Sequence, residues 1–551
     1  MKKIMAAAIG NCVHVAGVMN FLKYAENEGY ATEFLGPAVS IENLIKRVME
    51  EKPDIVGVSY RLTPSAAGPL LDKLKENISR YNLNDIEWLF GGTEPVCEVA
   101  KKYDLFSEIF DGSYGDDHTV DFLRGFKNNV LKETYESNII DRINSKYPRP
   151  LLRHHLGLPS LGDTIESVKK IAESKILDVI SIAPDQNAQE HFFDMEKADH
   201  SLDGAGGAPV RYPDDFRKIY EASRRGNYPI LRCYSGTNNV FKFASMLKET
   251  INNGWAAIPL CWYNVLDGRG PRDVVSSIRE SQKLMRWHAK RNIPVEVNEA
   301  HHWSLRDAHD TIGVATAFLA AYNAKRMGVK NYIAQYMLNV PPSISPKMDL
   351  AKMLAKIELI ESLQDSNFKV YRQVRPGLAS FPTDLYAAKG QLASSVYLGM
   401  ALKPHIVHVV AYCEAHHAAG FDEINESCRI AKGVIKNCMM GLPDMSSDMN
   451  VGDRKNELIK EAEYLLESIY RISPNSQDPW SDPEVLAEAI KLGILDAPHL
   501  KGNAYAKGTL ETKVIDGACF AYDSIEKRVL TEKERVDKIL RVQKEDEALI
   551  V

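Results

Sequence analysis

A histidine near the start of the chain lies where a ligand could bind. The stretch Gly10–Gly17 reads Gly-Asn-Cys-Val-His-Val-Ala-Gly and contains His14. It follows the apolar run Ile4–Ile9 and precedes a segment with apolar residues at helical spacing. This order places His14 in the first strand-to-helix loop of an α/β unit, and ligands bind at such loops, outside the carboxyl ends of the strands. A loop histidine without any ligand is the alternative.

Further side chains capable of chemistry follow apolar runs in the middle of the chain. Two groups are rich in imidazole, thiol and carboxyl groups: Glu299, His301 and His302, and Cys413, Glu414, His416 and His417. Such groups at strand ends could bind a divalent metal ion. Arg375 follows another run and could hold one carboxylate through two hydrogen bonds, and Tyr234 and Gln186 offer further polar contacts. Arg372 alternates onto the face of Val374, which favours a structural ion pair.

Length and composition describe a protein of several domains. At 551 residues, two or three domains are expected. The content of 45% hydrophobic and 26% charged residues is typical of globular proteins, and a net charge of −6 gives no sign of a nucleic-acid partner. We find no apolar run long enough to cross a membrane and no signal peptide, so we expect a cytoplasmic protein without a membrane partner. The eight cysteines form no C-x-x-C pair, which argues against a zinc or iron–sulfur site.

Residues 1–130 are expected to form one α/β domain. Apolar runs alternate with helical patterns, and Ser40 is a suitable N-cap for a helix that begins at Ile41. The predicted strands are Ile4–Ile9, Thr32–Leu35, Ile55–Ser59, Glu87–Phe90 and Glu108–Phe110. This alternation predicts a doubly wound parallel sheet. Its ligand-facing loops would be 10–17, 59–65, 91–94 and 112–116.

A second alternating series follows a predicted linker over residues 131–175. Between 176 and 445, amphipathic segments separate strand-like runs at Leu177–Ala183, Pro229–Cys233, Ala256–Trp262, Pro294–Asn298, Tyr332–Met337, Phe368–Val374 and Ile406–Ala411. Seven or eight such repeats predict a (β/α)8 TIM barrel, whose functional groups lie just after the strands. Residues 446–551 are expected to form a C-terminal extension.

The spacing from His14 to Gly17 resembles the D-x-H-x-x-G signature of the B12-binding domain, with Cys12 in place of the aspartate. That family also carries a small hydroxylated residue after the third strand, here Ser59, and Gly-Gly after the fourth, here Gly91-Gly92-Thr93. The resemblance implies that cobalamin binds and that His14 is the lower ligand of its cobalt. The residues expected around the corrin and its tail are Gly17, Ser59, Thr63, Gly91, Gly92, Thr93 and Gly112. A flavodoxin-like domain with ordinary glycine turns is the alternative.

The barrel half resembles the catalytic subunit of glutamate mutase (methylaspartate mutase) over roughly residues 175–525. The likeness is carried by Leu177–Ala183, Gly204-Ala205-Gly206-Gly207, Ser235-Gly236-Thr237, Gly254-Trp255, Ala379–Asp384, His417-Ala418-Ala419-Gly420 and Ala489–Pro498. The arginines that grip the two carboxylates of the substrate in that family fall at Ala188, Tyr234 and Glu299. Glutamate would leave charge unpaired in such a site, so it is not the expected substrate.

The resemblance implies an adenosylcobalamin-dependent radical mutase that acts on a small molecule other than glutamate. Its expected catalytic residues are Glu299, His301, Arg375 and Tyr234, with His417 at the cofactor. Two alternatives remain open. The histidine-rich strand ends could serve a methyltransferase, hydrolase or lyase that uses cobalamin or another metal, or the protein could be a non-catalytic cobalamin carrier or sensor. The family likeness also implies a homodimer.

Overall fold

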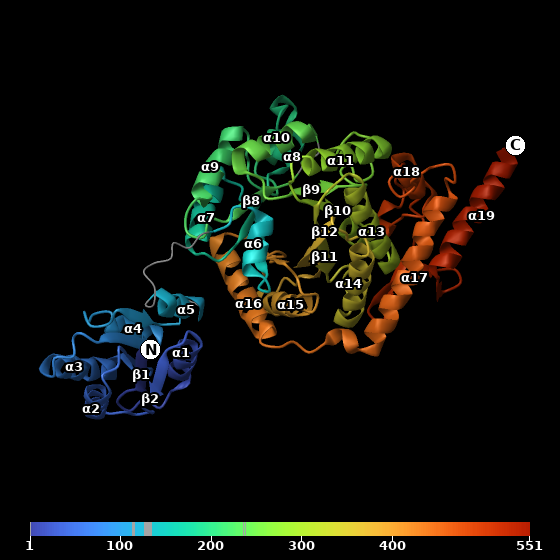
Figure 1. Ribbon diagram of the computed structural model, residues 1–551. Helices are drawn as coiled ribbons and strands as arrows, with labels where there is room; N and C mark the ends of the chain where they lie inside the picture. The colour runs from blue at the N-terminus through green and yellow to red at the C-terminus, as the bar shows by residue number, and fades with distance from the viewer. Residues whose placement is uncertain (1, 113–115, 126–134, 235, 237, 551) are drawn as a thin grey trace. The chain divides into compact units, whose positions relative to one another are not determined.

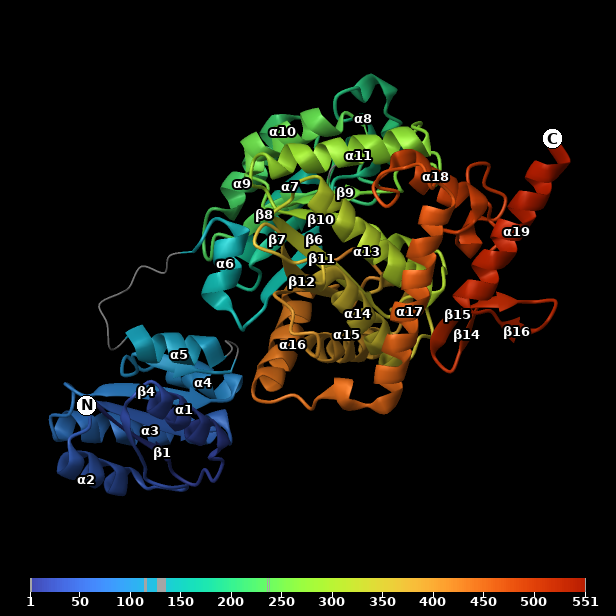
Figure 2. The ribbon, with the colours of Figure 1, turned by 45° about the vertical axis from the view of Figure 1, so that its right-hand side comes forward.

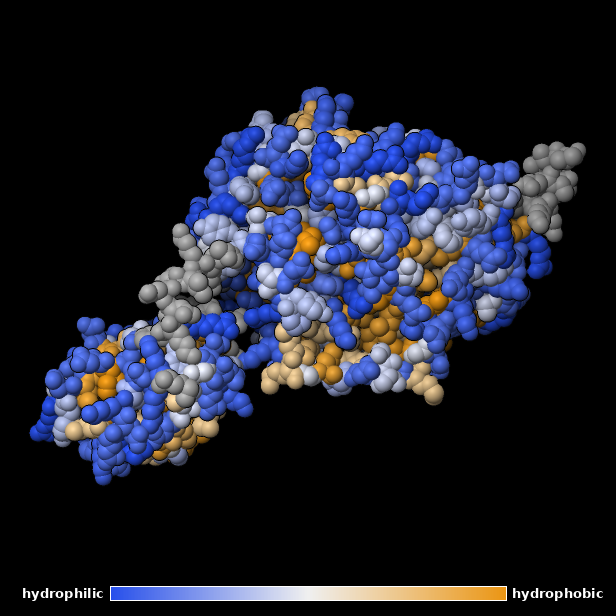
Figure 3. All heavy atoms as spheres, viewed as in Figure 1, coloured by the Kyte–Doolittle hydropathy of each residue, from blue (hydrophilic) through white to orange (hydrophobic). Residues whose placement is uncertain are grey.

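A computed structural model describes residues 2–112, 116–125, 135–234, 236 and 238–550 (Figures 1 and 2). The chain divides into two compact units, Met1–Thr134 and Tyr135–Val551. No helix in the described residues combines the length and the apolar character needed to cross a bilayer. The face drawn in Figure 3 is mostly hydrophilic, as the content of charged residues predicts.

The N-terminal unit is a doubly wound parallel sheet, as predicted. Its strand order is β2-β1-β3-β4-β5. The strands are β1 (Lys3–Ala8), β2 (Ala31–Phe34), β3 (Ile55–Tyr60), β4 (Glu87–Gly92) and β5 (Glu108–Phe110), and the helices are α1 (Ala16–Asn27), α2 (Ile41–Glu51), α3 (Pro64–Arg80), α4 (Glu94–Ala100) and α5 (Asp116–Gly125). The order reverses between β1 and β3, which makes their carboxyl ends the expected ligand crevice of a flavodoxin-like sheet.

Local sequence explains these elements. The Ser40 side chain accepts a hydrogen bond from the Asn43 backbone N–H at 3.2 Å, so Ser40 is the N-cap of α2, as predicted. The apolar residues of that helix recur on one face and are buried, namely Ile41, Leu44, Ile45 and Val48. The strands β1 and β3 are apolar along most of their length because helices cover both faces of the sheet.

The second unit is built on eight parallel strands in the order β8-β7-β6-β13-β12-β11-β10-β9. They are β6 (Leu151–Leu156), β7 (Val179–Ile182), β8 (Ile230–Cys233), β9 (Ala256–Pro259), β10 (Val295–Asn298), β11 (Asn331–Leu338), β12 (Lys369–Pro376) and β13 (Ile406–His408). A parallel bridge between Tyr234 and Ala257 joins the two end strands, so the barrel is nearly closed. The predicted TIM barrel is confirmed.

Helices follow each strand and surround the barrel (Figure 1). The main ones are α7 (Leu161–Glu173), α9 (Pro213–Ser223), α10 (Val240–Ile251), α11 (Val274–Ala289), α13 (Asp310–Arg326), α14 (Pro346–Glu361), α15 (Leu385–Met400) and α16 (Phe421–Met439). Shorter helical segments are α8 (Gln186–His191) and α12 (Ala300–Ser304).

The start of the barrel differs from the prediction. The expected linker 131–175 contains α6 (Ile139–Lys146), β6 and α7, and β6 pairs with both β7 and β13. The first barrel strand is therefore β6 and not the run at Leu177–Ala183. The sequence of β6, Leu-Leu-Arg-His-His-Leu, is polar at its centre because its inner face belongs to a polar interior. That composition hides the strand from a search for apolar runs.

The amino-terminal end of the barrel is closed by apolar side chains. One buried cluster joins inner-facing residues of the strands to two residues of α6, Ile139 and Ile143. The strand members are Leu151, Val179, Ile230, Ile333, Tyr371 and Ile406. Because α6 precedes β6 and packs on this layer, it plugs the barrel at the end opposite to the carboxyl ends of the strands.

The C-terminal extension is part of the barrel unit. It contains α17 (Met449–Arg471), α18 (Pro483–Leu492), β14 (Thr512–Ile515), β15 (Ala518–Asp523), β16 (Arg528–Val529) and α19 (Glu532–Ile550). The buried carboxylate of Asp310 on α13 lies 3.3 Å from both Lys352 on α14 and Arg454 on α17. It also accepts a 3.0 Å hydrogen bond from the Cys519 N–H of β15. The extension is thus tied to the barrel by buried charge as well as by packing.

Candidate functional site

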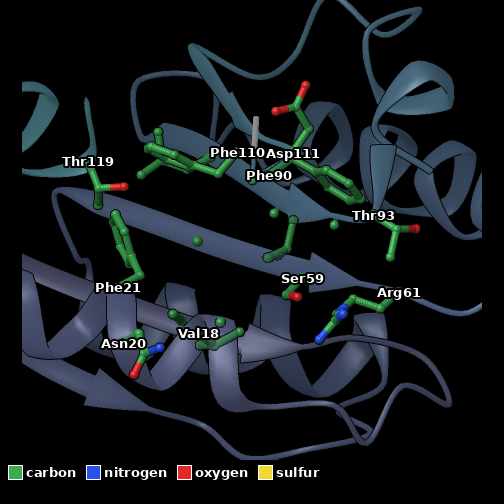
Figure 4. Close-up of a pocket in the computed structure, with 18 of the residues that line it drawn as sticks. Val18, Asn20, Phe21, Ser59, Arg61, Phe90, Thr93, Phe110, Asp111 and Thr119 are labelled. Atoms are coloured by element: carbon green, nitrogen blue, oxygen red, sulfur yellow. The ribbon is translucent and has the colours of Figure 1, made fainter. Parts of the chain in front are cut away.

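A cavity of about 480 Å³ lies at the carboxyl ends of β1, β3, β4 and β5 in the N-terminal unit (Figure 4). Aromatic and aliphatic side chains line most of it: Val18, Phe21, Tyr24, Leu89, Phe90 and Phe110. Polar groups stand at intervals along the wall, with Ser59 from β3, Thr93 after β4, and Arg61 and Asp111 near its edge. An apolar cavity with a few polar groups along its wall can bind an extended organic ligand.

Glycines give this cavity its width. A Cβ on Gly92 would lie 2.7 Å from the Tyr60 carbonyl oxygen, a distance that side chains do not adopt. A Cβ on Gly57 would lie 3.4 Å from that of Ala6, so the strand there also has little room for a side chain. The backbone of β3 and β4 therefore forms part of the wall, and a ligand can approach it closely.

Six of the residues expected to contact the cofactor line the cavity. They are Gly17, Ser59, Gly91, Gly92, Thr93 and Gly112. Thr63 lies apart from them, as the N-cap residue of α3. The rest of the predicted loop Gly112-Ser113-Tyr114-Gly115, from residue 113 on, is outside the described residues. The structure thus brings together residues that lie far apart in sequence.

His14 lies in the loop between β1 and α1 and is exposed to solvent. Cys12, which holds the place of the signature aspartate, is fully buried, and its Sγ is 3.9 Å from His14 Nδ1. A thiol is a weak partner at that distance, so Nε2 and Nδ1 both remain available to a ligand. His14 is not one of the residues that line the cavity, and the next lining residue along the chain is Gly17, three residues further on.

The barrel interior carries a buried polar layer above its apolar plug. Arg153 on β6 donates to Ser181 Oγ at 2.7 Å and to Gln373 Oε1 at 2.6 Å. Its guanidinium also lies 3.4 Å from Glu296 on β10. The Glu296 carboxylate accepts a 2.7 Å hydrogen bond from Trp255 Nε1 and lies 3.8 Å from Arg232. This layer, called here the arginine layer, comprises Arg153, Ser181, Arg232, Glu296 and Gln373.

Closer to the carboxyl ends of the strands lies a set of neutral hydrogen-bonding groups. Tyr234 Oη lies 2.9 Å from His155 Nε2, and Arg153 Nη2 lies 3.0 Å from the same nitrogen. Because arginine can only donate, His155 Nε2 must be the unprotonated nitrogen. On β11, Gln335 donates to His301 Nδ1 at 3.1 Å. His155, Tyr234 and Gln335 each keep part of their surface accessible, so solvent reaches this level of the barrel.

Burial and nearby arginines keep these groups in one protonation state. The pKa of His155 is well below its usual value because the side chain is buried beside Arg153. Burial and Arg375 lower the pKa of His301 to about 3. Burial raises the pKa of Tyr234 to about 12. The imidazoles are therefore neutral and the phenol protonated at pH 7, so they recognise ligands by hydrogen bonds and not by charge.

Arg375 differs from the other interior arginines. Alternation along β12 places it on the same face as Gln373, inside the barrel, where it is 7% exposed. Its Nε donates to the Pro376 carbonyl at 3.3 Å. Among the described residues, neither Nη makes a hydrogen bond and no carboxylate lies within 4.0 Å of the guanidinium.

Glu299 is not brought to this polar set. One carboxylate oxygen accepts hydrogen bonds from the Leu260 and Cys261 N–H groups at 3.1 and 3.0 Å, and the other from Trp303 Nε1 at 2.7 Å. Glu299 is 1% exposed and joins the end of β9 to α12. Protein donors already occupy both oxygens, so the arrangement suits a structural role.

The histidine-rich segments do not assemble a metal centre. His416 and His417 contact each other, with their Nδ1 atoms 2.9 Å apart, and both are exposed. His417 also lies 3.6 Å from Glu423. Within the part of the chain that the structure describes, no group of three or more His, Cys, Asp or Glu residues is arranged to hold a metal ion.

Several interior residues escaped the sequence analysis. Arg153, His155, Arg232 and Glu296 lie within strands and not after them, whereas candidates were sought just past the strand ends. The signal that could have found the two arginines is alternation, since each is two residues from an apolar inner-facing neighbour: Leu151 before Arg153 and Ile230 before Arg232. Arg372 was placed correctly, because its guanidinium donates to Glu361 at 2.6 and 2.8 Å on the outer face.

The B12 binding domain family matches residues 2–119. Among solved structures, the chain is similar to a cobalamin-binding protein from Desulfitobacterium hafniense DCB-2, with 23% identity and a TM-score of 0.20 over 23% of this chain. The chain spans 59% of that protein's length. It is also similar to a cobalamin-dependent S-adenosylmethionine radical enzyme, OxsB, at 10% identity and a TM-score of 0.19, over 90% of this chain and 73% of that one.

No curated protein matches the chain. The TM-scores to the solved structures are too low to support a statement on function, and the likeness of the barrel to glutamate mutase stays a prediction. The family match agrees with the cavity, because the residues that line it, from Ala6 to Thr119, all fall within residues 2–119. Residues 2–119 are therefore a B12-binding domain, carried at the start of a chain that continues into a parallel eight-stranded barrel.

Proposed function

We propose that this protein is an adenosylcobalamin-dependent mutase that rearranges the carbon skeleton of a small substrate, or moves a group within it. The observation that carries the proposal is the presence, in one chain, of a B12-binding domain with an apolar cavity and of a barrel with a buried polar interior. When bound, adenosylcobalamin supplies radical chemistry through its weak cobalt–carbon bond. The protein has to hold the cofactor, orient the substrate and exclude water.

The B12-binding domain has the groups for the first task. In this proposal the His14 imidazole is the lower ligand of cobalt, and the nucleotide tail of the cofactor enters the cavity lined by Ser59, Gly91 and Gly92. Glycine backbone on two strands allows close approach, and the Ser59 and Thr93 hydroxyls offer hydrogen bonds to polar atoms of the tail. A histidine ligand usually has a hydrogen-bond partner, and the Cys12 thiol lies 3.9 Å from His14 Nδ1.

The barrel has the groups for the second and third tasks. Its apolar plug excludes water from one end, and its neutral His155, Tyr234 and His301 side chains can orient a substrate without exchanging protons with it. Buried polar atoms without partners are costly in a scaffold that binds nothing. In the part of the chain that the structure describes, such atoms of the barrel include Arg232 Nε, Asn298 Oδ1, His302 Nε2 and His408 Nδ1. They favour an enzyme over a non-catalytic cobalamin carrier.

The test is the visible absorption spectrum of the full chain mixed with adenosylcobalamin. We expect the base-off, histidine-on spectrum for the wild-type protein and its loss in His14→Ala. His200→Ala removes an exposed histidine of the other unit and should leave the spectrum unchanged. Small carboxylic acids are then screened by NMR for isomerised products. Binding without any isomerisation, or methyl transfer from methylcobalamin instead, would contradict the mutase proposal.

A further inference from the structure

We propose that the barrel binds its substrate through a single carboxylate held by Arg375, so that the substrate is a small monocarboxylic acid with one uncharged polar substituent. This inference rests on the proposed function and names the substrate class for that same site. It starts from Arg375, a residue that is 7% exposed and whose guanidinium has no carboxylate within 4.0 Å among the described residues.

The interior of the barrel has more buried cations than anions. Arg153, Arg232 and Arg375 face inward, and Glu296 is the carboxylate that the arginine layer contains. Arg153 and Arg232 both point at Glu296, at 3.4 and 3.8 Å, and so share that charge. Among the described residues Arg375 has no carboxylate within 4.0 Å, and Glu414 and Glu296 act on it only from a greater distance. A buried charge without a partner is costly, and an anionic ligand would remove that cost.

The position of Arg375 makes it the arginine that a ligand would meet. The other two belong to the layer next to the apolar plug, where both are at most 1% exposed. Arg375 lies one inner-facing position further along β12 than Gln373, toward the carboxyl ends of the strands. Neither Nη group donates to another of the described residues, which suits two parallel hydrogen bonds to a carboxylate.

The hydrogen-bonding groups around Arg375 are neutral, and the carboxylate of Glu414, which acts on Arg375 electrostatically, lies more than 4.0 Å away. Arg375 acts electrostatically on Tyr234, His155 and His301, because it contributes to lowering the pKa of each of them. These three side chains offer a phenol and two imidazoles, which recognise an amide, hydroxyl or uncharged amine by hydrogen bonds. They offer no second cation at this level of the barrel. A second carboxylate on the substrate would therefore lack a partner, which agrees with the loss of the arginines that grip glutamate in the glutamate mutase family.

Binding can be measured on the full chain without cobalamin, so the result does not depend on the mutase proposal. The probes are butanoate, 2-methylpropanoate, butanamide, pentanedioate and inorganic phosphate, each followed by saturation-transfer NMR and titration. We expect the two monocarboxylates to bind and the amide to bind at least tenfold more weakly. Phosphate binding without carboxylate binding, or tighter binding of the dicarboxylate, would overturn the proposal.

The decisive comparison uses two arginines of one strand. Arg375→Gln should weaken monocarboxylate binding at least tenfold, and Arg375→Lys should retain part of it. Arg372→Lys, on the outer face of β12, should leave binding unchanged. Each variant must keep its far-UV circular dichroism and the cobalamin spectrum of the wild-type protein. If Arg375→Gln binds the carboxylates as tightly as the wild-type protein, Arg375 is not the anchor, whatever the cobalamin spectrum shows.

Discussion

Arg372 and Arg375 stand on the same strand, β12, and face opposite sides of the barrel wall. Arg372 points outward and forms a two-pronged ion pair with Glu361 of α14, whereas Arg375 points inward and has no carboxylate partner. Arg372 therefore holds α14 against the barrel, whereas Arg375 remains available for a ligand. Strand alternation alone decides which arginine has which role.

Arg372→Gln should destabilise the barrel unit by about 1–2 kcal/mol, because it breaks charge-assisted hydrogen bonds that are only partly shielded from solvent. The pKa of Arg372 is raised mainly by its hydrogen bonds to Glu361, which agrees with a favourable pair. Thermal and urea unfolding of Arg372→Gln, Glu361→Gln and the double variant would give the coupling free energy between the two side chains. Additive single effects would show that the two side chains do not stabilise each other.

Gly92→Ala should destabilise the B12-binding domain by about 1–3 kcal/mol, because the added methyl group overlaps the Tyr60 carbonyl oxygen. It should also weaken cobalamin binding, since the strands that line the cavity must shift. Gly17→Ala is the matched control: it lines the same cavity, and a Cβ there meets nothing within 4 Å. Calorimetry of the full chain with and without cobalamin separates the two effects. Equal behaviour of the two variants would contradict the steric argument.

Arg61→Ala should weaken cobalamin binding about threefold to tenfold. Arg61 lines the cavity next to Ser59 (Figure 4) and makes no ion pair or hydrogen bond with the residues that the structure describes. Its charge is thus available to the phosphodiester of the cofactor tail. Titration by absorbance should show a smaller dependence on salt in Arg61→Ala than in the wild-type protein, with Arg61→Lys between them. An unchanged affinity at low salt would remove Arg61 from the site.

Glu532 should make the barrel unit sensitive to acid. This buried carboxylate lies 2.9 Å from His309 and 2.5 Å from Arg535, and these partners lower its pKa from 4.5 to about 2. A carboxyl group whose pKa is lower in the folded state stabilises the protein above pH 4.5, and this contribution is lost between pH 4.5 and about 2. Glu532→Gln should lower stability at pH 7 and flatten its decline in that window. Glu463→Gln, which changes an exposed carboxylate of α17, should keep the wild-type profile.

Much of this fold could be predicted because its signals are local. The loop around His14, the Ser40 cap and the Gly91-Gly92 turn each depend on a few neighbouring residues, and a family signature adds to them. The strand β6 was missed since its inner face is filled by Arg153 and His155, which mimic a surface segment. A barrel with a polar interior removes the apolar alternation on which strand prediction depends.

The candidate site was harder to predict than the fold. Glu299 directly follows β10, yet its backbone turns there with φ −127° and ψ −72°, and its carboxylate goes to the N–H groups after β9. No pattern in the sequence gives the direction of such a turn. Arg375 was identified because it directly follows the predicted strand Phe368–Val374, whereas Arg232 and Glu296 fall inside predicted strands and acquire their partners from strands far away in the sequence.

The plug formed by α6 limits where small molecules can enter and leave the barrel. Ile139 and Ile143 seal one end with apolar side chains, so small molecules can reach Arg375 only from the carboxyl ends of the strands. Substrate and product must then use the same opening of the barrel, and a product has to leave before the next substrate enters. A product that dissociates slowly would act as a competitive inhibitor of substrate binding. In this way α6, a helix far from the reacting atoms, would fix the order in which product leaves and substrate enters.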